Sequence, residues 1–339
     1  MTLTADEKRH LPTHEDNQSV KLTPETLMKK ATDQTRYGIY EWFGRDAVEL
    51  DLPQRRQLLK SAAGKDTSSE ACPFAESIIT EAKCSKPGGV CSIRKYQKIG
   101  GIISVKDDVP VTVCPQRFLE SKELLRWVGK VMLGGEHPIA IKEIPFLAKM
   151  SNDEEDEKKK AGRIDWVLVD PASLDTTMRW CALETQAVYF SGKAMASEFQ
   201  QWAGTVSEKI PFPTENRRPD YRSSGPKRLA PQLQVKVPEL RNWGAKTAVL
   251  VDQFFFSQMS DLRELTGPEH DRLANSDVVW FVANYRNRQL VPGRVVYSRL
   301  SESITALNAT RPVGKSAFES EIRDSISNSH KRGRRVFIL

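Results

Sequence analysis

Ile164-Asp165-Trp166-Val167-Leu168-Val169 is an apolar run with one acid inside it. A second acid lies in Leu183-Glu184-Thr185-Gln186, at the end of the apolar run Trp180-Cys181-Ala182-Leu183. Their β-branched and apolar residues predict two strands, over residues 163–170 and 179–190, joined by a turn rich in Asp, Pro and Ser. Acids are rarely buried in such strands without a partner or a metal ion. One acid in each of two apolar strands therefore indicates a functional site.

Asp165, Glu184 and Gln186 are the candidate catalytic residues. Residues two apart in a strand share a face, so Glu184 and Gln186 point together, and antiparallel pairing brings Asp165 to Glu184. Carboxylates are preferred Mg²⁺ ligands, and Mg²⁺ there would neutralise phosphate charge and acidify a water molecule that Gln186 orients. Many such sites have lysine at the Gln186 position, and Lys193 is a candidate source of the missing charge. The alternative is that the pattern arises by chance.

Four of the five cysteines lie in one stretch with the spacing Cys-x11-Cys-x6-Cys-x22-Cys, at Cys72, Cys84, Cys91 and Cys114. The gaps match no zinc ribbon, but four thiolates can bind one metal ion tetrahedrally if the fold gathers them. We expect a structural Fe or Zn site; disulfides and unrelated buried thiols are the alternatives. Cys181 lies in an apolar run and is expected to be a buried core thiol.

The composition is that of a soluble globular protein, with 39% hydrophobic and 28% charged residues and a net charge of +7. No apolar run reaches the ~18–20 residues that span a bilayer. The polar N-terminus predicts no signal or transit peptide, so we expect a cytoplasmic protein. Residues 217–246 carry eight Lys or Arg against two acids, and a second basic cluster is His330-Lys331-Arg332-Gly333-Arg334-Arg335. Such clusters favour nucleic acids, the alternative being a solvated face and a frayed tail.

The rest of the chain predicts strands interleaved with helices, which is typical of the α/β fold class. Expected helices are a first arm from Thr23, with Leu27, Ala31, Tyr37 and Trp42 on one side, then residues 55–63, 74–82, 119–132, 238–265 and 302–307. Further expected strands are residues 102–105, 109–113, 139–146, 278–285 and 294–298. The charged run at residues 153–160 is expected to be a solvated loop.

Taken together, these motifs resemble the NotI-type type II restriction endonucleases. The resemblance is carried by Cys72-Pro73-Phe74, Cys84, Gly89-Val90-Cys91, Val113-Cys114-Pro115, Asp165-Trp166 and Leu183-Glu184-Thr185-Gln186. It implies a restriction-endonuclease-like central mixed sheet flanked by helices, of the PD-(D/E)xK type with glutamine in place of lysine. The expected parts are an N-terminal helical arm, partly disordered (1–60), an inserted four-cysteine metal-binding module (61–125), the nuclease core with DNA-binding loops (126–315) and a basic tail (316–339).

The resemblance also implies roles and partners. Asp165 and Glu184 would bind catalytic Mg²⁺ with Gln186 beside them, and the four clustered cysteines would bind one structural iron. The enzyme would be a bacterial homodimer that cuts double-stranded DNA at a GC-rich palindrome, with a separately encoded cognate DNA methyltransferase. The spacer before Asp165 is shorter than the family's, and Glu143 and Glu136 are alternative sources of an additional acid.

Two other functions remain open from the residues alone. One is an iron–sulfur repair or CRISPR-associated nuclease with the same core, and the other is a metal-braced DNA-binding regulator without chemistry. Candidate base contacts lie in residues 217–228 and in Tyr285-Arg286-Asn287-Arg288, because Arg and Asn read bases in the major groove. Phosphate contact or plain surface is the alternative for each.

Overall fold

The computed structural model describes residues 33–63, 70–148, 160–192, 195–204, 210–309 and 313–327. The strands are β1 (Gln34–Trp42), β2 (Arg45–Asp46), β3 (Val90–Ile99), β4 (Ile102–Val105), β5 (Val111–Thr112), β6 (Ile139–Ala148), β7 (Lys160–Val169), β8 (Trp180–Thr185), β9 (Tyr189–Ser191), β10 (Arg218–Asp220), β11 (Lys246–Asp252), β12 (Val278–Arg286) and β13 (Gln289–Ser298). The α-helices are α2 (Leu52–Ala63), α3 (Glu123–Leu133), α5 (Ala196–Gly204), α6 (Tyr221–Ser224), α7 (Ala230–Asn242), α8 (Gln253–Ser257), α9 (Glu269–Asn275), α10 (Leu300–Asn308) and α11 (Lys315–Ser327). Short 3-10 or π turns are η1 (Pro87–Gly89), η2 (Pro115–Lys122), η3 (Pro171–Ser173) and η4 (Gly225–Leu229).

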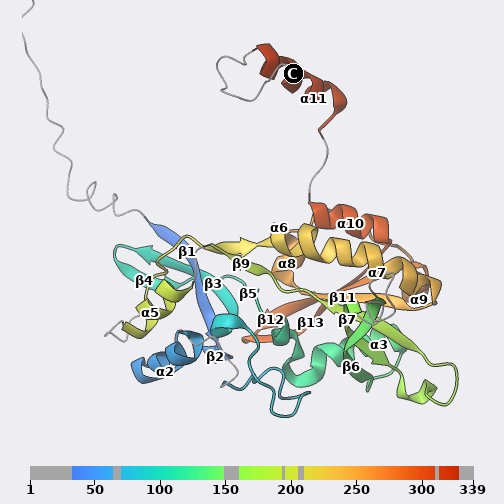
Figure 1. Cartoon of the computed structure of the whole chain (residues 1–339), viewed down its shortest axis with the longest axis horizontal. Helices are drawn as coiled ribbons and strands as arrows, with labels where there is room; N and C mark the ends of the chain where they lie inside the picture. The colour runs from blue at the N-terminus through green and yellow to red at the C-terminus, as the bar shows by residue number, and fades with distance from the viewer. Residues whose placement is uncertain are drawn as a thin grey trace, which may run out of the picture.

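The larger sheet has six strands in the order β13-β12-β11-β8-β7-β6. The three central strands β8, β11 and β12 run parallel, and the outer strands pair antiparallel. Helices lie on both faces, α3 on one and α7 with α10 on the other (Figure 1). The predicted α/β class with a central mixed sheet flanked by helices is therefore confirmed.

Successive side chains of β11 point to opposite faces of the sheet and contribute to two different core clusters. Ala248 and Leu250 pack into the cluster that includes α3, whereas Val249 and Val251 pack into the cluster that includes α7. Trp127 of α3 meets Phe281 of β12 edge to face, with ring centroids 4.9 Å apart. The sheet is thus buried on both sides, which is why its parallel strands are continuous apolar runs.

The predicted long helix over residues 238–265 is wrong. The segment holds the end of α7, then β11 and then α8. Gly244, in the left-handed region at φ +73°, follows the end of α7, and its N–H donates to the Arg241 carbonyl at 2.9 Å. A short apolar run fits a buried parallel strand as well as a helix, so periodicity alone did not separate the two.

The smaller sheet has the order β2-β1-β3-β4, with β5 on β3. It contains Tyr37 and Trp42, so the prediction that these residues belong to a helical arm is wrong. The Trp42 ring stacks on Phe199 of α5 with centroids 5.3 Å apart, and its indole N–H donates to the Gly88 carbonyl at 2.9 Å. This tertiary burial stabilises a strand where the spacing of apolar residues suggested a helix. The start of the predicted arm, with Leu27 and Ala31, lies outside the described residues.

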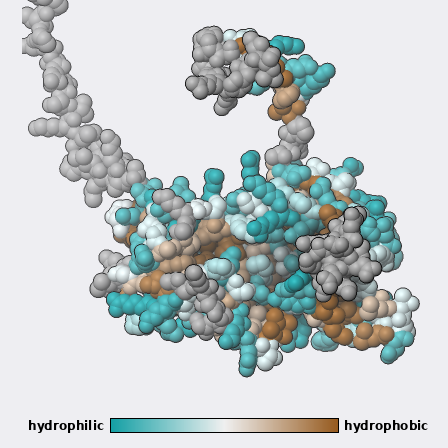
Figure 2. All heavy atoms as spheres, in the orientation of Figure 1, coloured by the Kyte–Doolittle hydropathy of each residue, from teal (hydrophilic) through white to brown (hydrophobic). Residues whose placement is uncertain are grey.

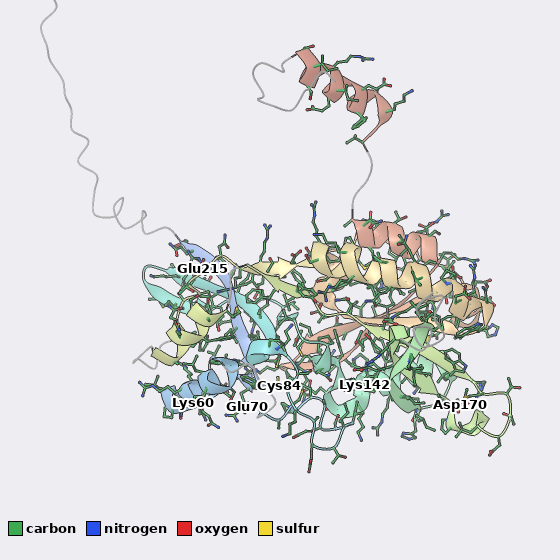
Figure 3. The ribbon with its side chains drawn as sticks, in the orientation of Figure 1. Lys60, Glu70, Cys84, Lys142, Asp170 and Glu215 are labelled. Carbon is green, nitrogen blue, oxygen red and sulfur yellow. The ribbon has the colours of Figure 1, made fainter. Side chains whose placement is uncertain are left out.

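The cysteine stretch is less regular than predicted. Residues 74–82 form turns rather than a helix, because the chain doubles back between Cys72 and Cys84. The Cys72 N–H donates to the Ala82 carbonyl at 2.8 Å, and the Cys84 N–H donates to the Glu70 carbonyl at 2.9 Å. Figure 3 shows Glu70 and Cys84 next to each other below α2. The predicted strand 109–113 is confirmed only over β5.

The remaining predictions of helix and strand agree in type with the structure, with shifted ends. Residues 55–63 lie in α2, 119–132 in η2 and α3, 302–307 in α10, 102–105 in β4, 139–146 in β6, 278–285 in β12 and 294–298 in β13. Most of the charged run 153–160 and the basic cluster at 330–335 lie outside the described residues. Helix α11 stands apart from the body (Figure 1). Among the described helices, none is long and apolar enough to cross a membrane.

Candidate active site

Asp165 and Glu184 occupy facing positions on the neighbouring strands β7 and β8. The register pairs Trp166 with Leu183 and Val167 with Ala182, and one more step sets Asp165 against Glu184. Val167 and Ala182 pack in the cluster that contains Leu240 of α7. Because side chains alternate along a strand, both acids lie on this same α7 face. The predicted juxtaposition of the two acids is therefore present.

The Asp165 carboxylate is fixed by the residue that follows Glu184. Its Oδ2 accepts the Thr185 backbone N–H at 2.9 Å and the Thr185 hydroxyl at 3.1 Å. Asp165 is half-buried and lines the adjacent cavity. The two strands thus hold one carboxylate in a defined orientation at the edge of open space.

Glu184 is buried, with 2% of its surface exposed. Its Oε1 accepts a hydrogen bond from Lys236 Nζ at 2.7 Å, while its Oε2 has no hydrogen-bond partner among the described residues. Burial and then the Asp165 charge raise the pKa of Glu184 to about 7, against the opposing effect of Lys236. A buried acceptor without a partner is costly, so this oxygen is a natural position for a cation ligand.

Lys236 was not recognised from the sequence, where it counted only as one of the basic residues at 217–246. It lies on α7, its side chain is 6% exposed, and it projects from the helix face that carries Leu233, Val237 and Leu240. Its spacing of three residues from Leu233 and four residues from Leu240 was the available signal for burial. Lys193, the predicted source of positive charge, lies outside the described residues.

Gln186 follows directly after β8. Its backbone N–H donates to the Leu250 carbonyl at 3.0 Å and continues the pairing with β11. Its side-chain Nε2 donates to the Ala187 carbonyl at 2.6 Å. The amide is therefore near the acids in the chain but is engaged with its own neighbour.

A cavity of about 310 Å³ opens beside Asp165, and Arg163, Gln232 and Lys236 are also among its lining residues. Arg163 is exposed at its rim, so the cavity joins a buried lysine and a half-buried carboxylate to solvent. Such a space, with positive groups around the Asp165 carboxylate, suits an anionic phosphodiester together with a hard cation.

Of the two candidate additional acids, Glu143 lies opposite Asp165 and Glu136 lies before β6. Glu143 of β6 stands opposite Asp165, between the paired positions Lys142–Trp166 and Ile144–Ile164. Its backbone is left-handed at φ +56°, and its carboxylate pairs with Arg163 at 2.8 Å and with Lys142 at 3.2 Å. Glu136 is exposed and pairs with Lys130 at 2.7 Å.

The described residues contain no group of three or more His, Cys, Asp or Glu arranged to hold a metal ion. Two carboxylates are nevertheless sufficient for Mg²⁺, which keeps several waters and uses substrate phosphate as a further ligand. The partnerless Glu184 oxygen and the fixed Asp165 carboxylate therefore fit such an ion.

All five cysteines are buried, and none of them forms a disulfide bond. Cys91 lies on β3 and Cys114 directly after β5, which pairs with β3. The Cys91 thiol donates to the Gly89 carbonyl at 3.5 Å, and the Cys84 thiol donates to the Lys86 carbonyl at 3.7 Å. Burial and then Cys114 raise the pKa of Cys91, while burial raises the pKa of Cys114 to about 11. In this arrangement Cys91 and Cys114 stay protonated, and the two thiols suit a thiophilic metal only after proton loss.

Cys181 is 1% exposed, and burial raises its pKa to about 12. Its side chain packs among the residues between the sheet and α3. The prediction of a buried core thiol is confirmed.

The model of the family described as restriction endonuclease NotI matches residues 55–294. The chain belongs to the NotI restriction endonuclease family. It is therefore an endodeoxyribonuclease, a hydrolase that acts on double-stranded DNA as a type II restriction endonuclease, and such enzymes generally use Mg²⁺. A search of curated proteins found no match.

In this NotI-family enzyme, several residues expected to contact DNA bases form contacts within the protein. Arg217 is buried and paired with Glu198. Arg288 pairs with Asp46, and the Tyr285 hydroxyl lies 2.9 Å from the Thr112 hydroxyl of β5. The burial of Arg217 contradicts its prediction as a base contact. For Arg288 and Tyr285, which also make contacts within the protein, base contact stays a prediction.

Other basic side chains of the same region remain available for DNA. Arg218, Arg222, Lys227 and Arg228 are exposed along β10, α6 and η4, and the Arg228 guanidinium lies 4.0 Å from the centroid of the Tyr189 ring. Figure 2 shows mostly hydrophilic side chains over the side of the molecule where α7 and α10 lie. Exposed positive charge of this kind supplies phosphate contacts.

Proposed function

We propose that this restriction endonuclease hydrolyses phosphodiester bonds in double-stranded DNA with Asp165 and Glu184 as the carboxylates of an Mg²⁺-dependent, PD-(D/E)xK-like site. The observation that supports it most is the facing pair on β7 and β8, with the buried Glu184 Oε2 left without a partner among the described residues. An unpartnered acceptor at the end of two paired strands serves no packing purpose, and a catalytic cation would satisfy it.

Each residue of the proposed site has a separate role in hydrolysis. A bound Mg²⁺ would supply an acidified water molecule and neutralise phosphate charge. Thr185 orients Asp165 through two hydrogen bonds, and Lys236 orients Glu184 through one. Gln186 exchanges its bond to the Ala187 carbonyl for the attacking water, which it can both donate to and accept from.

The enzyme acts as a homodimer and cuts a GC-rich palindrome. It works in the bacterial cytoplasm, where a separately encoded DNA methyltransferase protects the host DNA. The symmetry of a palindromic target supports the dimer, because two copies of one site related by a two-fold axis cut both strands in the same way. The exposed Arg and Lys of β10, α6 and η4 are suited to hold the duplex backbone.

Digestion of DNA tests the proposal directly. The purified enzyme is incubated with supercoiled plasmid and with bacterial genomic DNA, in Mg²⁺ or in EDTA, and the fragment ends are sequenced. We expect discrete fragments with one common GC-rich palindrome at their ends, in Mg²⁺ only. Intact plasmid would indicate a DNA-binding regulator, and unspecific degradation would indicate a repair-type nuclease.

We also propose that Cys72, Cys84, Cys91 and Cys114 hold one structural iron, with zinc as the alternative. Their burial on adjoining segments supports this, since deprotonation of four thiols by a metal would replace the weak thiol–carbonyl contacts. The ion would brace the irregular loop between Cys72 and Cys84.

Metal analysis of two cysteine variants tests the structural site. Cys91→Ser removes one ligand, so we expect loss of bound metal and a melting temperature lower by several degrees. Cys181→Ser is the matched control, a buried thiol outside the set, and should keep its metal. Equal metal content in both variants, or a stable but inactive Cys91→Ser enzyme, would contradict a structural site.

A further inference from the structure

We infer that Lys236 of α7 is the positively charged group of the active site and that its ammonium binds the DNA phosphate undergoing cleavage. It supplies from a helix the charge that the motif lacks at Gln186 on the strand. The inference rests on the proposed function of Asp165 and Glu184.

The position of Lys236 is costly for packing alone. It projects from the apolar face of α7 beside Leu233 and Val237, and its side chain is 6% exposed. A lysine is almost never buried to this degree without an acidic partner, and methionine would fill the same space without a charge to desolvate. The partner is Glu184, whose Oε1 lies 2.7 Å from Lys236 Nζ.

The ammonium has bonding capacity beyond this ion pair. It carries three N–H donors, and Glu184 accepts one of them; within the described ranges the ammonium forms no other hydrogen bond. Lys236 and Asp165 line the same cavity of about 310 Å³. Two donors of one cation therefore remain for the oxygens of a phosphate that enters the cavity beside Asp165.

The other positive group at this cavity is less suited to the role. Arg163 has an exposed side chain and is paired with Glu143 at 2.8 Å. An exposed cation is screened by water and salt, whereas a buried one acts in a medium of lower dielectric constant. Lys236 is therefore the cation whose charge the reacting phosphate senses most strongly.

Relocation of the charge separates a catalytic lysine from one that only neutralises Glu184. The variants are Lys236→Gln, Lys236→Arg and the double variant Lys236→Gln/Gln186→Lys, which returns a lysine to the strand. Lys246→Gln is the control, because Lys246 is a partly buried lysine bonded to the carbonyls of Ala274 and Ser276.

Single-turnover cleavage in Mg²⁺ is the first readout. Loss of one preorganised donor to a charged transition state lowers rates by ~100- to 1,000-fold, which we expect for Lys236→Gln. Lys236→Arg should keep part of the activity, the double variant should recover at least ~10-fold over the single variant, and Lys246→Gln should cleave like the wild type.

Salt dependence of DNA binding is the second readout and needs no catalysis. A short duplex with the cleavage site, identified by sequencing the digest ends, is titrated in EDTA at several salt concentrations. One lost phosphate contact lowers the slope of log Kd against log salt by about one, in Lys236→Gln but not in the double variant. Thermal melting verifies folding, and Lys236→Met serves if the glutamine variant does not fold.

The outcomes distinguish this inference from the function on which it rests. Wild-type cleavage by Lys236→Gln with an inactive Glu184→Ala enzyme would overturn the role of the lysine and keep the carboxylate site. Wild-type cleavage by Glu184→Ala would overturn the proposed site itself. An unchanged salt slope with no recovery in the double variant would reduce Lys236 to a structural counter-ion.

Discussion

Asp252 shows how one buried acid ties distant elements together. It is fully buried at the end of β11, accepts the Phe255 N–H at 2.7 Å as the N-cap of α8, and accepts the Thr112 N–H of β5 at 2.7 Å. Burial raises its pKa to about 6. A single carboxyl thus joins the larger sheet to the smaller one.

The raised pKa of Asp252 predicts a pH dependence of stability. The folded state binds this proton more tightly than the unfolded state, where the pKa is near 3.8. The contribution of this proton to the free energy of unfolding is therefore largest below about pH 4 and is lost as pH rises through 6. Relative to Asp252→Asn, the free energy of unfolding should fall by about 2 kcal/mol between pH 4 and pH 7.

Urea denaturation across this pH range measures the effect of Asp252. The exposed Asp261→Asn variant is the control and should follow the wild type. Parallel curves for wild type and Asp252→Asn would contradict the raised pKa.

At the scale of single residues, the sequence was informative where alternation sets the geometry. Asp165 and Glu184 were placed together because acids in apolar strands with a short connection allow only a few registers. Lys236 was not, because helical spacing identifies a buried face but not the acid beneath it. The burial of Arg217 and the pairing of Arg288 depend on partners far away in the chain, so local composition suggested a DNA-binding surface instead.

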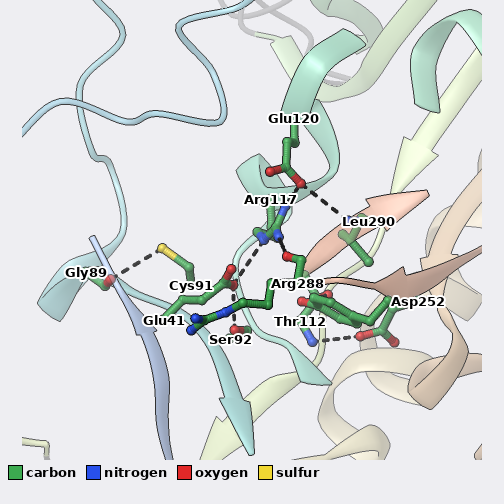
Figure 4. A network of polar contacts seen from close by, with 11 residues as sticks. Glu41, Gly89, Cys91, Ser92, Thr112, Arg117, Glu120, Asp252, Arg288 and Leu290 are labelled. Atoms are coloured by element: carbon green, nitrogen blue, oxygen red, sulfur yellow. Dashed lines mark hydrogen bonds and ion pairs between the residues drawn. The ribbon is translucent and has the colours of Figure 1, made fainter. Parts of the chain in front are cut away.

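Among the elements, η2 carries a second contact between the two sheets, in addition to that of Asp252. Arg117 is fully buried, and its Nε donates to Glu41 of β1 at 3.0 Å while its Nη2 donates to the Arg288 carbonyl at 2.6 Å (Figure 4). Its Nη1 pairs with Glu120, and its guanidinium lies 4.3 Å from the centroid of the Phe74 ring. One arginine thus links β1, the β12–β13 turn and the cysteine stretch.

Breaking this network should be strongly destabilising. Arg117→Met leaves the buried Glu41 carboxylate without its charged partner, which costs about 3–5 kcal/mol of unfolding free energy. Arg163→Met removes an exposed pair and should cost less than about 1 kcal/mol. Urea denaturation compares the two, and similar small losses would show that Arg117 does not join the sheets.

Elements with a clear local pattern were predicted correctly from the sequence, and elements that depend on distant contacts were not. The antiparallel strands β6 to β8 and the pair β12–β13 have alternation and turn residues that local patterns capture. The strands β1 and β11 depend on burial by distant segments, such as α5 against Trp42, so their helical readings were wrong. The turns at residues 74–82 are set by backbone bonds across the cysteine loop, which helical spacing does not reveal.

For the whole molecule, a palindromic target requires two copies of the site. We expect the enzyme to sediment at twice the 38.3 kDa of one chain and to linearise plasmid in one binding event. Analytical ultracentrifugation with and without a site-bearing duplex measures the mass. A 38.3 kDa species in both conditions, with nicked plasmid as the product, would contradict a dimeric enzyme.

The central claim is that the facing carboxylates of β7 and β8 carry out hydrolysis of DNA. Single-turnover cleavage and duplex binding by Glu184→Ala, beside the exposed control Glu136→Ala, test it most directly. We predict no detectable cleavage by Glu184→Ala with duplex binding still measurable, and full activity in the control. Cleavage by Glu184→Ala at the wild-type rate would contradict the account.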